Sequence, residues 1–307
     1  MSQTPNPISI YQDQLLEEAA AYFEEEEIPQ KIVDAFRKAP RHRFVSRFLS
    51  NSEEGWIDVT ESNLNLHLSS LYGNHPLCIH LDDKGVVDST ISQPSLVLLM
   101  LDLLDLREGL RVFELGAGSG WNAALMGALV GNSGEVTSYE IIEDLVVPAQ
   151  RSADELGLSN VSIVSGNGIE AMKSEGPFDR GVFTAAADSL PDCFFDGIKE
   201  GGLLLLVIKI NGDGDLLAVL RKTGDHFDSE YHFKCRFVPV TGVQLQDDKH
   251  IENLGCRRWV AHGQPDIEEL DLRIHPSGKP VELDESNWTI SHSSCILEWR
   301  IRGGHAK

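Results

Sequence analysis

A long hydrophobic run is missing from the sequence, and its absence argues against a membrane-spanning helix. Nowhere in the 307 residues do about twenty apolar residues follow one another, which is the length that a helix needs to cross a bilayer. The stretch Met1–Pro5 also lacks the basic residues that open a secretory signal. We therefore expect a cytoplasmic protein with no membrane partner.

Positive charge is scarce as well. The chain has 26 lysines and arginines against 48 aspartates and glutamates, which gives a formal charge of −22 at pH 7. A chain with this balance is repelled by phosphate backbones and by anionic lipid surfaces. We predict that nucleic acid is not a partner.

Cysteines with metal-site spacing are also missing. The five cysteines are widely scattered, and no two of them form a C-x-x-C motif, the spacing that is typical of structural zinc sites. His75, Cys78 and His80 lie close together but have no fourth ligand nearby. We expect reduced thiols and no bound metal.

What the sequence does contain is a glycine-rich turn between a predicted strand and a predicted helix. Arg111-Val-Phe-Glu-Leu115 is strand-like, three alternate glycines follow at Gly116, Gly118 and Gly120, and a helix-like run begins at Asn122. Glycine permits positive φ and lets a ligand press against the main chain, where a Cβ would collide. The stretch predicts a nucleotide-type site, with an unliganded tight turn as the alternative.

Two nucleotide motifs are excluded by the residues that follow the glycines. The dinucleotide motif needs a small residue where Trp121 stands, and a P-loop needs Gly-Lys-Ser/Thr, which is absent. The remaining pattern, E-x-G-x-G-x-G, resembles that of S-adenosylmethionine-dependent methyltransferases. Glu140 ends the next strand-like run, and 140 − 120 = 20 residues is about the spacing at which an acidic side chain meets ribose hydroxyls. This residue favours a site over an empty turn.

The middle of the chain alternates between strands and helices. Apolar runs without alternation indicate strands that are buried on both faces of a parallel sheet. Tyr11–Arg37 has helical periodicity, which Pro29 interrupts. We expect an α/β fold with strands near Arg111–Leu115, Glu135–Tyr139, Val161–Val164, Gly181–Thr184 and Leu203–Ile210.

A series of short motifs then resembles the protein-L-isoaspartate O-methyltransferase family between about Ile28 and Gly242. The most specific of them is Thr90-Ile-Ser-Gln-Pro94, which matches the family word T-I-S-Q-P without change. The others, in chain order, are Ala39-Pro-Arg-His-Arg-Phe-Val45, Leu71-Tyr-Gly-Asn-His-Pro-Leu-Cys-Ile79, Phe113–Trp121, Ser165-Gly-Asn-Gly168, Pro177-Phe-Asp179, Thr184-Ala-Ala-Ala187 and Gly201-Gly202.

This resemblance implies a fold and a domain organisation. The fold would be a doubly wound, mostly parallel seven-stranded methyltransferase sheet with helices on both faces, closed by antiparallel strands near Leu216–Leu220 and Phe233–Val240. We predict an N-terminal helical segment (1–70), a methyltransferase domain (71–242) and a small β-rich appendage (243–307). The appendage carries Trp259, Trp288 and Trp299, which we expect to pack onto the main domain.

The resemblance also implies roles for individual residues. Ser92 would be the catalytic residue, because its hydroxyl would orient the acceptor carboxylate. Substrate would be bound by Thr90, Gln93, Ala186 and Ala187. S-Adenosylmethionine would be bound by Thr90, Ile91, Glu114, Gly116, Ala117, Gly118, Gly120, Glu140, Asn167 and Gly168.

The expected chemistry needs no general base. A carboxylate with a pKa near ~4 is already ionised at neutral pH, and the methyl group on a sulfonium is already activated. The enzyme must therefore bring the two together in a dry site. An alternative role for Ser92 is a helix N-cap, with Pro94 two residues further on.

Several residues depart from the family pattern. Asn167 replaces an aspartate that would accept a hydrogen bond from the adenine amino group, and asparagine can accept the same bond without charge. On the acceptor side Ser95 replaces a larger residue, Asp188 a proline and Val207–Lys209 a P-V-G sequence, and His80–Ser89 is longer than in the family.

Three functions are compatible with these residues. The first is methylation of L-isoaspartyl residues of peptides or proteins, in which the ester collapses to a succinimide as part of repair. The second is the same chemistry on an aspartyl carboxylate of a dedicated peptide substrate. The third is a non-catalytic S-adenosylmethionine-binding module that holds a partner.

Overall fold

The structure is a computed structural model, and it describes residues 6–50, 55–210, 214–239, 270–279, 281, 287–291 and 294–301. The chain divides into two compact units, Met1–Asn167 and Gly168–Lys307. The domain boundaries expected at residues 70 and 242 stay predictions. Trp259, Cys256 and Gly242 lie outside the described residues.

Helices and strands alternate along the first unit. Its helices are α1 (Pro7–Ala20), η1 (Glu24–Glu26), α2 (Gln30–Lys38), η2 (Arg41–Phe44), α3 (Leu64–Leu71), α4 (Pro94–Leu103), α5 (Trp121–Val130) and α6 (Glu143–Glu155). Its strands are β1 (Arg47–Leu49), β2 (Trp56–Asp58), β3 (Leu77–Leu81), β4 (Val87–Ile91), β5 (Arg111–Leu115), β6 (Glu135–Glu140) and β7 (Val161–Ser165). Among the described helices of the whole chain, none is long and apolar enough to cross a membrane.

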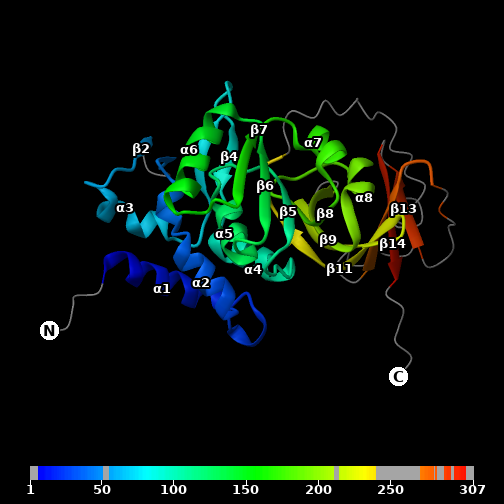
Figure 1. The fold of residues 1–307 in the computed structure, drawn as a ribbon, viewed down its shortest axis with the longest axis horizontal. Coiled ribbons are helices and arrows are strands. Elements are labelled where there is room, and N and C mark those ends of the chain that lie inside the picture. The colour runs from blue at the N-terminus through cyan, green and yellow to red at the C-terminus, as the bar shows by residue number, and fades with distance from the viewer. Residues whose placement is uncertain are drawn as a thin grey trace. The chain divides into compact units, whose positions relative to one another are not determined.

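Three parallel strands, in the order β5-β6-β7, form the centre of this unit (Figure 1). Val112, Phe113 and Val136 are fully buried there, as expected for strands covered on both faces. Parallel pairing aligns the carboxyl ends of neighbouring strands, so that Leu115 lies opposite Tyr139, and Glu140 opposite Ser165. The loops that carry the predicted cofactor residues therefore leave the sheet at one edge.

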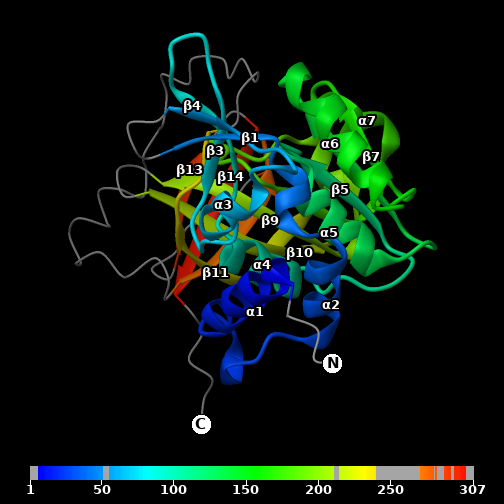
Figure 2. The same cartoon turned by 90° about the vertical axis from the view of Figure 1, so that its left-hand side faces the viewer.

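The N-terminal helices pack beside α4 and α5 (Figure 2). The expected interruption of the helical region at Pro29 is confirmed: α1 begins at Pro7 and ends at Ala20, and α2 begins at Gln30. The Asn6 side chain accepts a hydrogen bond from Ile8 N (3.1 Å) and caps α1. Two hairpins, β1-β2 and β3-β4, complete the unit.

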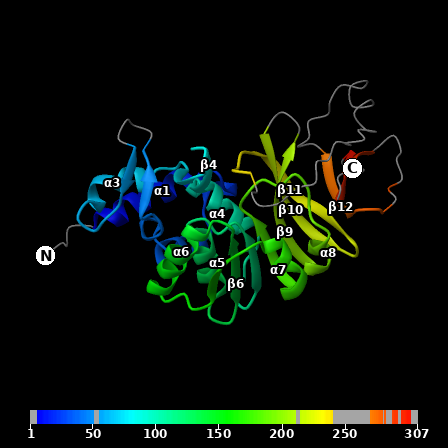
Figure 3. The ribbon, with the colours of Figure 1, turned by 90° about the horizontal axis from the view of Figure 1, so that it is seen from above.

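The second unit begins with a parallel strand pair and continues as an antiparallel sheet (Figure 3). Its elements are α7 (Gly168–Glu175), β8 (Phe178–Phe183), α8 (Cys193–Gly197), β9 (Ile198–Ile210), β10 (Gly214–Thr223), β11 (His226–Cys235), β12 (Leu270–Pro276), β13 (Asn287–Ser291) and β14 (Cys295–Ile301). The strand order is β13-β14-β12-β11-β10-β9-β8, and only β8 and β9 are parallel.

Strands β5 to β11 are the seven that the sequence and its resemblance predicted, and the α/β class is confirmed. The last of them was misplaced, since β11 spans His226–Cys235 rather than Phe233–Val240. The predicted β-rich C-terminal segment is present as β12, β13 and β14. Its attachment to β11 uses two register pairs, Phe227 with Ile274 and Asp228 with Arg273.

Trp299 on β14 provides a test of this C-terminal packing. The indole is fully buried, with the edge of His232 at 6.0 Å from ring centre to ring centre. Trp299→Ala should lower the free energy of unfolding by about 3–5 kcal/mol, because it removes a large buried side chain and leaves a cavity. Urea unfolding measures the change. Trp56→Ala, which removes a half-buried indole, is the control, and equal losses in the two variants would contradict the assigned burial.

Candidate active site

The glycine turn after β5 has the backbone conformation that the sequence predicted. Gly116, Gly118 and Gly120 have φ values of 97°, 52° and 80°, a region that side chains with a Cβ rarely adopt. The amide groups of Gly116 and Ala117 both donate to Tyr139 O, at 2.8 and 3.1 Å. The turn is therefore fixed to the end of β6.

The carboxylate of Glu140 holds the same turn from its other side. Its Oε2 accepts a hydrogen bond from Gly118 N (2.6 Å) and its Oε1 accepts one from Ile142 N (2.9 Å). A carboxylate has about four acceptor positions, so two remain for further donors such as ribose hydroxyls. Glu140 thus has the position and the acceptor capacity that the predicted role requires.

Asn167 belongs to the next loop of the same edge. It comes two residues after β7 ends at Ser165, and Gly166 N donates to Glu140 O (2.9 Å). The Asn167 side chain is exposed. Within the first unit, the residues predicted to meet the ribose and the adenine therefore stand on adjacent loops. Gly168, also predicted to bind the cofactor, is the buried first residue of α7 in the second unit.

The segment Thr90–Gln93 lies against the glycine turn. A Cβ added at Gly118 would come within 3.3 Å of Ser89 Oγ and 3.7 Å of Thr90 O. Ile91 is buried at the end of β4, and Thr90, Ser92 and Gln93 are half-buried. The structure thus brings the segment that contains the predicted catalytic residue next to the predicted cofactor turn.

The N-cap alternative for Ser92 is wrong. Helix α4 begins at Pro94 and its N-cap position is Gln93, without a capping side-chain hydrogen bond. Gln93 instead donates through Nε2 to Ser95 Oγ (2.9 Å). Ser95, which departs from the family pattern, therefore contacts Gln93, a residue predicted to bind the substrate. Capping therefore does not account for the Ser92 hydroxyl.

Glu114 lies below the turn and is fully buried. Its Oε1 accepts a hydrogen bond from Asn122 Nδ2 (2.6 Å) and its Oε2 accepts one from Ser138 Oγ (2.5 Å). Burial raises the pKa of this carboxyl to about 7, against the lowering effect of Ser138 and Asn122. Glu114 thus ties β5 to β6 and α5; its predicted contact with the cofactor stays a prediction.

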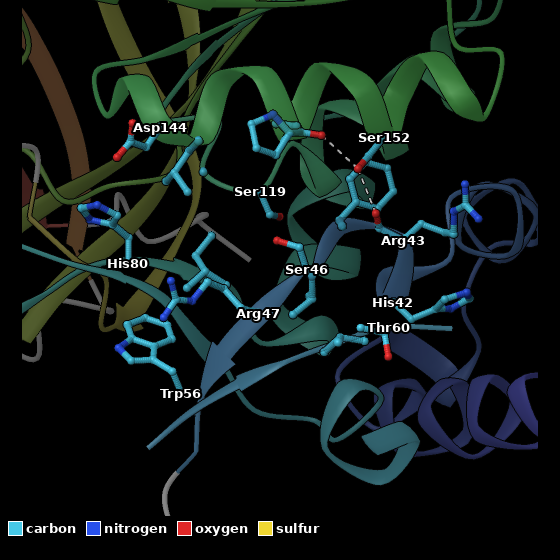
Figure 4. A pocket seen from close by; sticks show the side chains of 18 of the residues that line it. His42, Arg43, Ser46, Arg47, Trp56, Thr60, His80, Ser119, Asp144 and Ser152 are labelled. Atoms are coloured by element: carbon cyan, nitrogen blue, oxygen red, sulfur yellow. Dashed lines mark hydrogen bonds between the residues drawn. The ribbon is translucent and has the colours of Figure 1, made fainter. Parts of the chain in front are cut away.

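A cavity of about 830 Å³ opens beside Gly118 and Ser119 (Figure 4). Helix α6 runs along one side of the cavity, and Ser46 and Ser119 lie near the centre of the cavity. Its residues come from η2 to β2, the segment before α3, β3, the glycine turn and α6, and they include His42, Arg43, Arg47, Trp56, His80, Asp144 and Ser152. The lining includes neither Ser92 nor Glu140. Sequence motifs did not indicate this cavity, because its walls come from five separate segments.

The acceptor residues predicted in the second unit lie in an extended segment after β8. Ala186 N donates to Val238 O and Ala187 N to Val207 O, both at 2.8 Å, and both side chains are buried. The ammonium of Lys209 lies 3.4 Å from the Asp188 carboxylate. Two positions that depart from the family pattern therefore form an ion pair beside Ala187.

The raised pKa of Glu114 gives stability a pH dependence that Glu114→Gln should remove. The carboxyl titrates near 4.5 when unperturbed and at about 7 in the folded protein, so between these values the folded state binds more protons. Stability must then fall as pH rises through this window, by on the order of 3 kcal/mol. Urea unfolding at pH 5 and pH 8 measures this. The exposed Glu143→Gln is the control, and a parent and Glu114→Gln variant with parallel pH profiles would contradict the assignment.

Comparisons with known proteins agree with this arrangement. The family model described as protein-L-isoaspartate(D-aspartate) O-methyltransferase matches residues 24–245. Among similar proteins, the protein-L-isoaspartate O-methyltransferase of Fervidobacterium nodosum is 32% identical over 213 residues, which cover 69% of this chain and 94% of that protein. The Vibrio atlanticus enzyme of the same name is 33% identical over 216 residues, covering 70% and 90%.

Solved structures share the fold. A structure described as a protein-L-isoaspartate O-methyltransferase has a TM-score of 0.64 at 22% identity and covers 94% of this chain and 87% of its own. A putative Plasmodium falciparum enzyme of this kind, in complex with S-adenosyl-L-homocysteine, has a TM-score of 0.57 at 19% identity, with coverage of 77% and 98%. The family match spans the glycine turn, Glu140 and Thr90–Pro94 together. The chain therefore belongs to the protein-L-isoaspartate O-methyltransferase family of S-adenosylmethionine-dependent transferases.

Proposed function

We propose that this protein transfers a methyl group from S-adenosylmethionine to the side-chain carboxylate of L-isoaspartyl residues in proteins or peptides. The observation that supports the site most directly is the closeness of Gly118 to the Ser89 hydroxyl and the Thr90 carbonyl, which a Cβ at Gly118 would approach to 3.3 and 3.7 Å. It brings the segment of Ser92 against the cofactor turn, where acceptor and donor must meet. Family membership supports the class of acceptor.

The residues of the first unit fit S-adenosylmethionine. The positive-φ glycines leave the main chain open to a ligand, and Glu140 retains acceptor positions for the ribose. When bound, the cofactor would supply an activated methyl group on a sulfonium sulfur for transfer to the acceptor carboxylate, with S-adenosylhomocysteine as the leaving group. The chain itself needs only to bind, orient and desolvate the two groups.

Ser92 is the proposed orienting residue. Its backbone is fixed between the last residue of β4 and the first turn of α4, so a hydroxyl at this position has limited freedom. A hydroxyl can donate one hydrogen bond to a carboxylate, which would direct the other oxygen toward the methyl carbon. Asp and isoAsp carboxylates are ionised at neutral pH, so Ser92 does not have to remove a proton.

A dedicated peptide substrate is the second candidate, and the Asp188–Lys209 ion pair favours it. The pair is half-exposed and lies next to Ala187, where the family pattern has uncharged residues. Ala186 and Ala187 are the proposed acceptor-binding residues there. Charged groups on a surface that binds a peptide contribute more to the choice of partner than to the affinity for it. Non-catalytic binding receives no such support.

Proteins are the proposed partners, and the net charge of −22 disfavours nucleic acid. We keep the cytoplasm as the proposed compartment, because Cys78, Cys193, Cys235 and Cys295 are free thiols.

Replacement of Glu140 tests the cofactor site. Glu140→Ala should weaken S-adenosylhomocysteine binding at least about tenfold, because charge-assisted hydrogen bonds to the ribose are lost. Titration calorimetry measures the change. Glu143→Ala, three residues further on and exposed, should bind like the parent; equal affinity of all three proteins would place the cofactor elsewhere.

Replacement of Ser92 tests the proposed catalytic role. Ser92→Ala should lower kcat at least about tenfold while leaving S-adenosylhomocysteine affinity within about threefold, because the hydroxyl acts on the acceptor in the transition state. Base-labile methyl ester is measured with labelled S-adenosylmethionine on matched isoaspartyl and aspartyl peptides.

The two peptide sets separate the candidate functions. Methylation of isoaspartyl peptides of many sequences would support the repair function. Methylation of only one aspartyl sequence would instead support the dedicated peptide substrate. Equal turnover of parent and Ser92→Ala would remove Ser92 from the mechanism.

A further inference from the structure

Arg41 is a fully buried arginine without a carboxylate partner among the described residues. It begins η2, in the Pro40-Arg41-His42 part of a motif to which the sequence gave no role. Burying a charge without an anion is costly. The groups that accept its hydrogen bonds therefore indicate what the buried guanidinium holds in place.

The guanidinium donates to five backbone carbonyl groups of two chain segments, 71–75 and 91–92. Nη1 donates to Leu71 O (2.7 Å) and Gly73 O (3.3 Å). Nη2 donates to His75 O (3.0 Å), Ile91 O (3.2 Å) and Ser92 O (3.1 Å). The two Nη groups carry four N–H donors for these five carbonyls, so Nη2 shares one of its hydrogens between two carbonyls, whereas a lysine ammonium has only three donors in total. The carbonyl of the proposed catalytic residue itself is thus held by Arg41.

The same guanidinium also reaches the end of the cofactor turn. Its carbon atom lies 5.5 Å from the ring centre of Trp121, the residue that follows Gly120. The Trp121 Nε1 donates to Ala39 O (2.9 Å), two residues before Arg41. Arg41 therefore contacts both sides of the site, the acceptor segment through hydrogen bonds and the cofactor turn through the indole face.

The charge of Arg41 persists at neutral pH. Burial lowers the pKa of the guanidinium to about 9, and interaction with Tyr72 opposes this. The group therefore stays protonated near pH 7, and all five bonds remain charge-assisted.

We propose that Arg41 is the positioning residue of the acceptor site, which fixes Ile91 and Ser92 relative to the cofactor turn through its carbonyl hydrogen bonds and Trp121. This inference rests on the function proposed above. In this role Arg41 sets the position of the Ser92 hydroxyl. Arg41 itself is buried and is not assigned a contact with substrate or cofactor.

Kinetics of Arg41→Lys provide the first test, at a temperature where the variant is folded. Lysine keeps the charge but loses most of the carbonyl contacts, so kcat/KM for an isoaspartyl peptide should fall about tenfold to a hundredfold, the cost of a small displacement of a catalytic group. Affinity for S-adenosylhomocysteine should stay within about threefold. Arg37→Lys is the control, since Arg37 is an exposed arginine on α2, paired with Asp13 and outside the cavity lining.

Hydrogen exchange provides a second readout that needs no activity. In Arg41→Lys the peptide that covers residues 88–96 should exchange faster, while β5 and β6 exchange as in the parent. An arginine that serves only global stability would instead speed exchange in all of these strands. Should Arg41→Lys not fold, Arg41→Met, which removes the buried charge and places a shorter, unbranched apolar side chain there, takes its place.

The outcomes separate this inference from the proposed function. Unchanged kcat/KM, or uniform acceleration of exchange, would overturn the positioning role. An inactive parent would instead refute the proposed function, and the exchange experiment would still decide whether Arg41 holds Ile91 and Ser92.

Discussion

The hydrogen bond from Gly118 N to the Glu140 carboxylate is the contact on which the proposed cofactor site depends. It joins the turn after β5 to the end of β6, and it forms only because Gly118 takes a positive φ. The turn, the carboxylate and the neighbouring Thr90 backbone then occupy fixed positions relative to one another. A ligand that binds here meets a preformed site, so little of its binding free energy goes into ordering the chain.

The sequence predicted those parts of the site that depend on local constraints. Glycines at alternate positions after a strand indicate positive φ, and an acid twenty residues later indicates a ribose contact, because both follow from βαβ geometry. The parallel strands were placed closely for a similar reason, since short apolar runs bounded by turn residues are typical of strands buried on both faces. Strand β11 was placed too late because its first half, His226–Glu230, is largely polar, and such a segment lacks that pattern.

The interactions of Arg41 and Asp188 could not be predicted in this way. Backbone carbonyl groups are present at every residue, so the sequence does not reveal that five of them converge on Arg41. Asp188 and Lys209 are 21 positions apart, and only the register of the Ala187 segment against β9 brings them together. The N-cap alternative for Ser92 failed because it required Pro94 at the second helical position, whereas Pro94 is the first residue of α4.

The narrow attachment of the C-terminal strands has a consequence for how the second unit opens. Strands β12 and β14 share seven register pairs, whereas β11 and β12 share two. The other contacts to the residues before β12 are made mostly through side chains, among them the ion pairs Arg273–Asp228 and Lys279–Asp225 and the hydrogen bonds of Ser277 to Asp192. Separation at this boundary breaks few backbone hydrogen bonds and leaves β9, β10 and β11 paired. Opening of this kind has a lower free energy than global unfolding. The native ensemble should therefore contain a minor population in which β12, β13 and β14 have detached together while the strands before them keep their structure.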